Sequence, residues 1–536
     1  MTLMTQISQA SLIASLALEA EGIELFHTSG HEGYVRLPVD EHREVWPVRS
    51  TAFRRWLARQ YFNTMAGAPG GQALTDGLGV LEGIALFDGH ERDVHLRLAE
   101  HEGDIFLDLA DTQWRAVRIS ASGWEVVVDP PVRFRRARGM LPLPDPIAGG
   151  SLEALWQYIN VPDDEWPLLA GWIVGTLRPR GPYAVLLIYG EQGSAKSTLV
   201  RIARSLVDPN EAPVRREPRN GQDLIVAARN GLVVAFDNVS HLSQELSDDL
   251  ARLATGSGFG ARQLYTDLEE VVVHVSRPIA LNGIEEFAVR GDLLDRAVTL
   301  NLPPISEYRD EDEFWSSFDT DHPRILGALL DAASHALANH ATTIAPNIRM
   351  ADFARWVSAA EPALNLEAGS FVTAYRTNRE QAVRLTLDAS PISAPVIEVA
   401  AKGFEGTATA LLARLNELVS DEVRKQREWP KAAHTLSGRL RRLAPALRRV
   451  QVYVAFDRNT QGRSLRISTG PQGSVIGVTK RHRQGVPGQA VTLDDANDAS
   501  QQPSTSGPPG DETPDEGDIE RYAALARQVQ QEKEKQ

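Results

Sequence analysis

The stretch that decides the fold runs from Pro182 to Val207. It begins with the apolar run Tyr183-Ala-Val-Leu-Leu-Ile-Tyr189, continues through Gly190-Glu-Gln-Gly-Ser-Ala-Lys-Ser-Thr198, and ends in Leu-Val-Arg-Ile-Ala-Arg-Ser-Leu-Val207. The first run predicts a buried strand, and the apolar spacing after the loop predicts an amphipathic helix. A tight loop of small residues therefore connects a strand to the N-terminus of a helix.

This context predicts a phosphate-binding loop. Successive backbone N–H groups and the positive end of the helix would face one anion, with no bulky side chain in the way. Lys196 would reach the β- and γ-phosphates of a nucleotide, and the hydroxyl of Ser197 would ligate Mg²⁺. We therefore expect ATP and Mg²⁺ as cofactors. The predicted nucleotide-binding residues are Gly190, Glu191, Gln192, Gly193, Ser194, Ala195, Lys196, Ser197 and Thr198.

One position departs from the pattern G-x-x-x-x-G-K-[ST], because Ala195 stands where the second glycine belongs. Alanine is the smallest replacement and Gly193 adds backbone freedom, so we expect an intact but slightly altered loop. The alternative is an ordinary Gly/Ser turn between a strand and a helix. Because strand, loop and helix all agree, the nucleotide site is the favoured interpretation.

The composition is that of an ordinary soluble globular protein. Of 536 residues, 42% are hydrophobic, 24% are charged and none is cysteine. No apolar run reaches the ~18 residues of a membrane span, and the apolar patch from Ala10 to Ala20 lacks the preceding basic segment of a signal peptide. We expect a cytoplasmic protein without disulfides, Cys-ligated zinc or a membrane partner. The net charge of −15 argues against a uniformly basic surface for nucleic acid, but it allows a local basic patch.

Residues 1–145 are predicted to form an α+β domain of uncertain purpose, with a helix over about 50–64. A basic cluster around Phe134 is consistent with a nucleic-acid contact or with a solvated linker. The proline-rich segment Leu141-Pro-Leu-Pro-Asp-Pro146 marks the domain boundary. The strands indicated by short apolar or alternating runs are 33–39, 93–98, 104–109 and 123–128.

Residues 146–305 are predicted to form an ATPase core, in which polar residues follow further buried strands. The strand Gly231-Leu-Val-Val-Ala-Phe-Asp237 ends in a carboxylate that would hold Mg²⁺ directly or through water. The alternative is a strand that simply ends in an Asp-Asn turn. Its place ~40 residues after the phosphate loop favours the metal-binding interpretation. A further strand ends at Asn282, and Arg296 directly precedes another apolar run.

In this order the elements resemble a superfamily 3 helicase core. The resemblance covers about residues 180–305 and includes the hairpin sequence Arg262-Gln-Leu-Tyr265 between the strands that end at Asp237 and Asn282. Superfamily 3 helicases are AAA+ ATPases of phage, plasmid and viral replication, often fused to primases. The implied fold class is α/β, with an AAA+ P-loop ATPase core, the N-terminal α+β domain and a C-terminal winged-helix-like module.

The resemblance also implies roles for individual residues. Asn282 would be the sensor that orients the attacking water, and Arg296 would be the arginine finger that reaches the γ-phosphate bound to a neighbouring subunit. Arg262 and Tyr265 would face DNA in the channel of a homo-oligomeric ring, which we expect to be a hexamer. The predicted catalytic residues are Lys196, Asp237, Asn238, Asn282 and Arg296, and the predicted metal ligands are Ser197 and Asp237.

Two features depart from this family. Asn238 occupies the position of a second acidic residue, and an amide cannot accept a proton as a general base. Either another carboxylate, such as Glu191 or Asp223, serves as the base, or hydrolysis is slow. The hairpin tip, Asp267 to Glu270, is acidic and would repel a phosphate backbone.

The C-terminal third is predicted to be helical and then basic. Residues 306–400 are expected to form a lid or collar, with helices over 323–339, 350–360 and 366–378. Residues 405–468 carry 13 Lys and Arg against 6 Asp and Glu. There, helices at 407–419 and 436–442 precede two strands, as in a winged helix that binds DNA. A solvated basic face on a packing domain is the alternative. The predicted DNA-binding residues of this module are Lys431, Arg439, Arg441 and Arg442.

The remaining residues, 470–536, are rich in Gly, Pro, Gln, Ser and Asp and are predicted to be disordered, with a possible terminal helix from Ile519. Together these features predict a Mg-ATP-dependent ATPase that acts on single-stranded or forked DNA as a replicative helicase of a mobile element. A rival hypothesis is an ATP-assembled DNA-binding switch or initiator with little unwinding. A small-molecule kinase is a weaker third, because no acceptor site is evident.

Overall fold

A computed structural model describes residues 8–256, 259–262, 270–273, 275–284, 291–459 and 462–470 of the chain. These residues belong to two compact units, Met1–Ala382 and Val383–Gln536. The division falls before the expected border between lid and basic module at residues 400–405. Tyr265 and the predicted tail beyond residue 470 lie outside the described residues.

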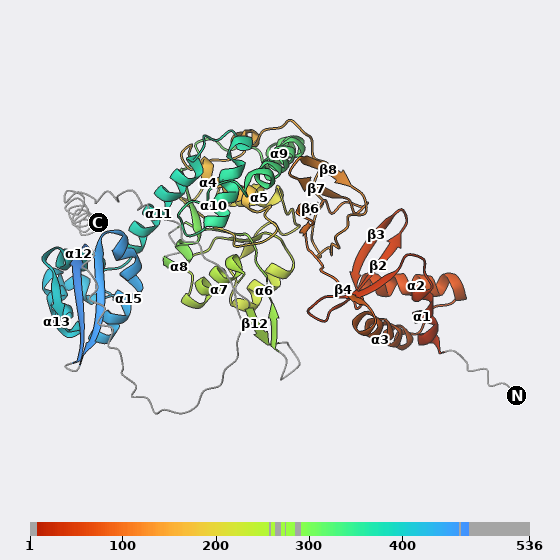
Figure 1. Cartoon of the computed structure of the whole chain (residues 1–536), viewed down its shortest axis with the longest axis horizontal. Helices are drawn as coiled ribbons and strands as arrows, with labels where there is room; N and C mark the ends of the chain where they lie inside the picture. Colours follow the sequence, from red (N-terminus) through yellow and green to blue (C-terminus); the bar gives the residue numbers. More distant parts are fainter. Residues whose placement is uncertain are drawn as a thin grey trace, which may run out of the picture. The chain divides into compact units, whose positions relative to one another are not determined.

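The larger unit is built around a five-stranded parallel sheet with the order β10-β11-β14-β9-β15. The sheet lies among the central yellow and green helices of Figure 1. Its strands are β9 (Val185–Gly190), β10 (Arg215–Arg216), β11 (Val234–Asp237), β14 (Ile279–Asn282) and β15 (Ala297–Leu302). The four longer strands are apolar and almost wholly buried, because helices cover both faces of a parallel sheet. Three predicted strands are confirmed: the strand before the glycine-rich loop, the strand that ends at Asp237 and the strand that ends at Asn282. The predicted α/β class is confirmed as well.

Alternate side chains of β9 enter two different cores. Leu186 and Ile188 pack with helices α4, α5, α9 and α10, whereas Val185 and Leu187 pack with α6, α7 and α8. This is the period-two alternation of a strand, and it defines three layers. The helices are α4 (Trp166–Gly175), α5 (Lys196–Ser205), α6 (Gly221–Arg229), α7 (Gln244–Thr255), α8 (Gly291–Leu294), α9 (Glu311–Asn339) and α10 (Ala351–Ala360).

Several helices extend beyond their predicted bounds. Helix α9 begins at Glu311 rather than Pro323, because Asp310 caps its N-terminus and three acidic residues occupy its first turn. Pro323 is accommodated inside the helix. Helix α11 (Ser370–Asp388) begins and ends later than predicted, and residues Leu152–Gln157 form a 3-10 helix.

Residues 1–145 were expected to form one α+β domain. They instead contain two separate four-stranded sheets. The first sheet, with the order β3-β2-β1-β4, has its own core with α1, α2 and α3. Its elements are α1 (Gln9–Leu18), β1 (Glu24–His27), β2 (Gly33–Val39), β3 (His42–Pro47), α2 (Thr51–Met65), α3 (Gly71–Phe87) and β4 (His90–Glu91). Helix α3 was not predicted, because its glycines lower helix propensity. Gly77 lets α3 pack closely on α1, since a Cβ there would lie 3.1 Å from Ile13 Cγ2 and would force a small shift.

The second sheet, β5-β6-β7-β8, shares the core of the central sheet. Ile105, Leu107 and Val117 belong to the same buried cluster as Leu186 of β9, and Trp124 Nε1 donates to Asp331 Oδ1 of α9 at 2.8 Å. The strands are β5 (Leu98–His101), β6 (Asp104–Asp108), β7 (Ala116–Ser120) and β8 (Gly123–Val127). Of the strand predicted at 93–98 only Leu98 lies in a strand, because β5 covers Leu98–His101.

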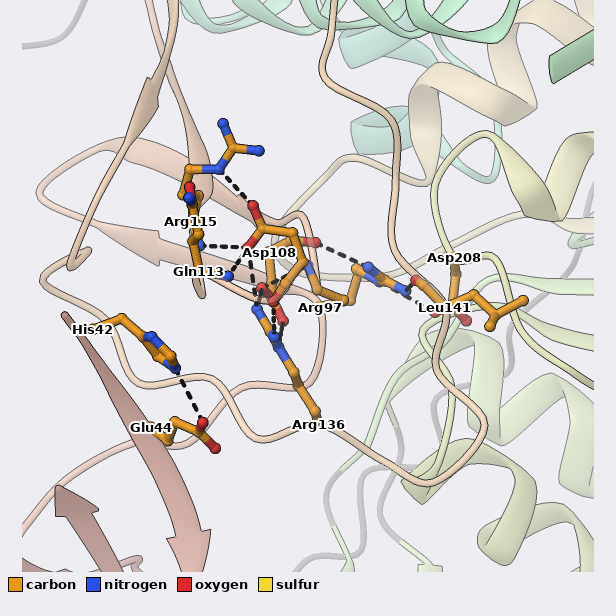
Figure 2. Close-up of polar contacts among 11 residues, drawn as sticks. His42, Glu44, Arg97, Asp108, Gln113, Arg115, Arg136, Leu141 and Asp208 are labelled. Atoms are coloured by element: carbon orange, nitrogen blue, oxygen red, sulfur yellow. Dashed lines mark hydrogen bonds and ion pairs between the residues drawn. The ribbon is translucent and has the colours of Figure 1, made fainter. Parts of the chain in front are cut away.

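A buried arginine ties this second sheet to the end of helix α5 (Figure 2). Arg97 is fully buried and donates to the backbone oxygens of Asp108, at 3.0 Å, and Leu141, at 2.8 Å. Its Nε lies 3.4 Å from a carboxylate oxygen of Asp208, which also pairs with Arg204. Burial lowers the pKa of Arg97, and the negative charges of the Asp208 and Asp108 carboxylates oppose this shift. A charge held at this depth is stable only while its partners stay in place.

The smaller unit combines helices with a three-stranded antiparallel sheet of order β16-β18-β17. Leu411, Leu440, Leu447 and Ile467 lie in its core. The two predicted strands are confirmed as paired, although the helix predicted at 436–442 extends over 433–449. The elements are α12 (Ser393–Lys402), β16 (Phe404–Gly406), α13 (Ala408–Leu418), α14 (Asp421–Lys425), α15 (Ala433–Arg449), β17 (Val452–Asn459) and β18 (Gly462–Thr469).

Within the part of the chain that the structure describes, no helix combines the length and apolarity needed to cross a bilayer.

Helix α9 contains a buried histidine that should make stability depend on pH. Burial lowers the pKa of His322 to about 4, whereas an exposed histidine titrates near pH ~6.5. Between these values the unfolded state binds the proton more tightly, so the unfolding free energy should fall by up to about 3 kcal/mol as the pH drops from 7 to 4. Urea unfolding at several pH values should show this loss, and the variant His322→Gln should show less of it. Equal pH dependence in both proteins would contradict the assignment.

Candidate functional site

The glycine-rich loop, residues 190–195, lies at the carboxyl end of β9 and leads directly into α5. Its backbone has positive φ angles at Gly190 (152°), Gly193 (81°) and Ala195 (62°). A Cβ on Gly190 would lie 2.6 Å from Ser194 Oγ and 2.7 Å from Leu302 O, so glycine is needed for space as well as for conformation. The loop is tightly wound, as a turn that wraps its backbone around an anion must be.

Ala195 is the N-cap of α5 and has left-handed geometry, with φ 62° and ψ 23°. An L-residue other than glycine is strained there by roughly 1–2 kcal/mol, which explains why the motif usually has glycine at this position. No side chain accepts a hydrogen bond from the first turn of α5. The N–H groups at this end therefore keep their capacity to bind an anion.

Lys196 folds back over the loop. Its Nζ donates to Gly190 O at 2.8 Å, to Glu191 O at 2.6 Å and to Ser194 Oγ at 3.3 Å. Burial lowers the pKa of this ammonium, and the charge of Asp237 opposes the shift. The ammonium of Lys196 thus lies over the loop, where an anion could replace the carbonyl oxygens as its partner.

Ser197 and Asp237 come together from α5 and from the end of β11. The Ser197 hydroxyl donates to Asp237 Oδ1 at 2.8 Å. A hydroxyl and a carboxylate are hard oxygen ligands of the kind Mg²⁺ prefers. The donor set therefore fits the predicted metal, and Lys196 and the end of α5 fit a phosphate chain. Thr198, the last residue of the predicted set, is half-buried in the first turn of α5.

Asn282 and Asn238 meet at the ends of the neighbouring strands β14 and β11. Asn238 has a positive φ of 55°, which asparagine tolerates better than most residues, and its N–H donates to Asn282 Oδ1 at 2.9 Å. The side chain of Asn282 is 1% exposed. Its Nδ2 has no hydrogen-bond partner among the described residues. An unpaired buried donor at this end of the sheet is costly, and a water or a ligand that accepts from it would remove the cost.

The two carboxylates considered as bases lie in different places. Glu191 is exposed within the glycine-rich loop. Asp223 lies in the first turn of α6, where its Oδ2 accepts from Arg219 N at 3.1 Å. No contact between either carboxylate and Asp237 occurs in the described part of the chain.

Arg296 lies at the end of the sheet where the strands begin, whereas the loop lies at the end where β9 stops. The carbonyl of Arg296 accepts a hydrogen bond from Val185 N, at the start of β9. At the other end of β15, Leu302 pairs with Gly190, the first residue of the loop. The six residue steps from Arg296 to Leu302 correspond to about 20 Å along β15. The side chain of Arg296 therefore cannot join Lys196 and Asp237 within one chain.

A charged cluster that the sequence did not indicate surrounds Arg296. Arg296 donates to the carboxylate of Asp292, whose Oδ1 also lies 3.2 Å from Arg349 Nη2. Arg349 Nη1 lies 2.7 Å from Asp295 Oδ2, and the buried Arg379 donates to the other oxygen of Asp295. These arginines come from positions 54 and 84 residues beyond Asp295, so no local pattern could have identified them.

A second unpredicted feature is the segment 303–310, which connects β15 to α9 and crosses the glycine-rich loop. Ile305 N donates to Gly193 O at 3.4 Å. The hydroxyl of Tyr308 lies 3.0 Å from the position that a Cβ on Gly193 would occupy. The only sequence signal would have been an aromatic residue shortly after the last strand of the core.

The predicted DNA-binding residues fall in two places. Arg262 is the last residue of β12 (Phe259–Arg262), which pairs antiparallel with β13 (Glu270–Val273), so the predicted hairpin is confirmed. Tyr265 and most of the acidic tip lie outside the described residues.

Helix α15 of the smaller unit carries five arginines and no carboxylate. Arg441 and Arg442 are exposed, Arg439 is half-buried, and the guanidinium of Arg441 lies 4.7 Å from the centre of the Phe456 ring of β17. Lys431 donates to the carbonyl of Arg424 in the preceding turn. Leu436, Leu440 and Leu447 form the buried side of the helix. None of the ion pairs among the described residues involves an arginine of α15.

Two regions of the chain match known protein families. Residues 152–384 match the family of the actinomycete integrative conjugative element replication protein, and residues 392–483 match the C-terminal domain of the same replication protein. The two regions follow one another and together make up more than half of the chain. No curated protein matches the chain.

Among solved structures, the chain is similar to the active helicase Cch of SCCmec type IV, with 11% identity, a TM-score of 0.47, and coverage of 83% of this chain and 92% of that one. It is also similar to the C-terminal region of NrS-1, with 11% identity, a TM-score of 0.39, and coverage of 85% and 99%. For the JCV helicase the identity is 15%, the TM-score 0.21, and the coverage 43% and 64%. All three TM-scores lie below 0.5.

The left-handed conformation of Ala195 leads to a stability prediction. Ala195→Gly should raise the free energy of unfolding by up to about 1 kcal/mol, because the relief of strain exceeds the entropy cost of glycine. Ala203→Gly, within the same helix in ordinary helical geometry, is the matched control and should lower it by about 1 kcal/mol or more. Urea denaturation of both variants measures the difference. A loss of stability in Ala195→Gly equal to that in the control would contradict the strained geometry.

Proposed function

We propose that this chain is a Mg-ATP-dependent AAA+ ATPase, similar to superfamily 3 helicases, that acts on DNA in the replication of an integrative conjugative element. The observation that carries the proposal is the meeting of Lys196, Ser197, Asp237 and Asn282 at the carboxyl edge of one parallel sheet, around the N-terminus of α5. The match to a replication-protein family over 152–384 supports the process in which this chemistry is used.

The phosphates of ATP would be held by the N–H groups of the loop and by Lys196, which would exchange its carbonyl partners for phosphate oxygens. Ser197 and Asp237 would hold Mg²⁺, which neutralises charge on the β- and γ-phosphates when it is bound. Asn282 is well suited to direct the attacking water, because Asn238 fixes its carbonyl oxygen and its Nδ2 remains free to donate. The general base would be Glu191 or Asp223.

Arg296 would act on the nucleotide of a neighbouring subunit. Its position about 20 Å from its own loop supports this arrangement, because a cation at that distance contributes nothing to the charge that develops on a transferred phosphoryl group. Each site would then be completed by the next copy of the chain, which requires a closed ring. We expect the hexamer that superfamily 3 helicases form.

The smaller unit would bind DNA as a winged helix. The order α12, β16, α13, α15, β17, β18 and the antiparallel sheet are consistent with this module, and α15 would be its recognition helix. The five arginines of α15, without a carboxylate on the helix, supply the positive charge that a phosphate backbone attracts. The partner would be single-stranded or forked DNA, in the cytoplasm.

One observation favours a second function, an ATP-assembled DNA-binding switch with little unwinding. Asn238 replaces the second acidic residue of the motif, and its backbone rather than a carboxylate engages Asn282. If no other carboxylate reaches the water, ATP would assemble the ring but hydrolysis would be slow. ATPase activity measured with and without single-stranded DNA distinguishes a motor, which DNA stimulates, from a switch, which it does not.

The catalytic assignment predicts two separable losses. Lys196→Ala should abolish ATP binding or turnover, since no other side chain of the loop supplies phosphate charge. Arg296→Ala should bind ATP nearly as well as the parent but turn it over on the order of 10³- to 10⁵-fold more slowly, because the arginine acts on the transition state. Mixing the two variants should restore part of the activity, since an intact loop can meet an intact Arg296 in a neighbouring subunit. No restoration in co-assembled subunits would refute the trans arrangement, and unchanged turnover in Lys196→Ala would refute the phosphate loop.

The DNA-binding assignment predicts a change in salt dependence. Replacing Arg439 and Arg442 with alanine should weaken DNA binding and reduce the slope of log affinity against log salt. The reduction should be about 0.9 for each duplex phosphate that the protein no longer neutralises, or about 0.7 for each phosphate of a single strand. The control is Arg424→Ala, in which the replaced arginine already pairs with Asp421. Binding titrations at several salt concentrations provide the measurement. A full slope in the double variant would mean that α15 is only a solvated face.

A further inference from the structure

The segment 303–310 is fixed on both sides of the glycine-rich loop. On one side, Ile305 N is hydrogen-bonded to Gly193 O, and Asn160 donates a hydrogen bond to Pro303 O. On the other side, α9 begins at Glu311, whose Oε1 lies 3.0 Å from Arg201 Nη1 of α5. The chain therefore passes from the last strand of the sheet, over the loop, into α9, whose first residue contacts α5. Its path is set by contacts to the loop and to α5.

Tyr308 is the large side chain that this crossing leaves in solvent. The residue is 78% exposed, although its hydroxyl lies close to Gly193. Single exposed apolar residues are common and need no explanation by themselves. Here, however, the aromatic ring stands beside the loop that would hold a phosphate chain, and a nucleoside attached to that chain must extend outward from the loop.

We propose that Tyr308 forms a base-binding subsite, in which its ring stacks on the base of the nucleotide whose phosphates the glycine-rich loop holds. This inference rests on the proposed nucleotide site and adds the determinant of base affinity. Stacking on an aromatic ring accepts any base, because every base has a π-face. The ligand class is thus a nucleoside triphosphate, with purines bound more tightly than pyrimidines because their larger faces overlap more of the ring.

The position of Gly193 supports the same geometry. Gly193 has a φ of 81°, and any side chain there would press on the hydroxyl of Tyr308. The loop therefore needs glycine at position 193 for its own conformation. The hydroxyl of Tyr308 lies close to this glycine, which places the ring beside the loop.

The test compares ATP with inorganic triphosphate, which has the phosphates but no base. Affinities of both ligands are measured by calorimetry for the parent, Tyr308→Ala, Tyr308→Phe and the control Phe87→Ala, which removes an equally exposed ring far along the chain. Tyr308→Ala should weaken ATP binding roughly 5- to 100-fold, the range expected for one stacked base. Tyr308→Phe and Phe87→Ala should stay within about twofold of the parent, and triphosphate affinity should be the same in all four proteins.

The possible outcomes separate this inference from the function on which it rests. If the parent binds ATP and Tyr308→Ala binds it equally well, the base subsite is refuted and the nucleotide site stands. If Tyr308→Ala and Tyr308→Phe weaken ATP and triphosphate alike, the hydroxyl contacts phosphate and stacking is again refuted. If the parent binds neither ligand, or Lys196→Ala binds both as the parent does, the nucleotide site itself is refuted and the subsite with it.

Discussion

The parallel alignment of the central strands is the constraint on which the site depends. Because β11, β14 and β9 run in the same direction, the residues that follow them emerge at one edge of the sheet. Asp237, Asn282 and the glycine-rich loop are separated by tens of residues in sequence, yet they become neighbours through strand pairing alone. Asp237 is only half-buried at its strand end, whereas Asn282 is 1% exposed and keeps one unpaired donor among the described residues.

The same alignment separates Arg296 from this edge. It precedes β15, so it lies where the strands begin, and the length of the sheet keeps it from its own loop. Its surroundings are correspondingly different. Asp292 and Asp295 bind Arg296, Arg349 and Arg379, so that carboxylates balance most of the charge of three arginines. One end of the sheet thus carries the glycine-rich loop, Asp237 and Asn282, and the other end carries a guanidinium cluster balanced by carboxylates.

The second N-terminal sheet shows how a supporting element is joined to the site. Its buried side chains belong to the central core, and Arg97 connects it to Asp208, which follows α5. Asp208 also accepts from the backbone N–H of Val233, just before β11. One buried carboxylate therefore contacts the end of α5, the strand that leads to Asp237 and the second sheet. Removing it would leave two buried guanidiniums without their partner.

By itself the sequence determined the features that depend on neighbouring residues. The apolar runs of β9, β11 and β14, the small residues of the loop and the polar residues at strand ends specify strand, turn and helix locally, and these predictions were confirmed. The tertiary structure alone decided the features that depend on packing. The four glycines of α3 argue against a helix until α1 packs against Gly77, and Pro323 suggests a helix start until Asp310 caps the chain a dozen residues earlier. Arg349, Arg379 and Tyr308 acquire their positions only because folding brings distant segments to the sheet, and no periodicity or spacing records contacts of that kind.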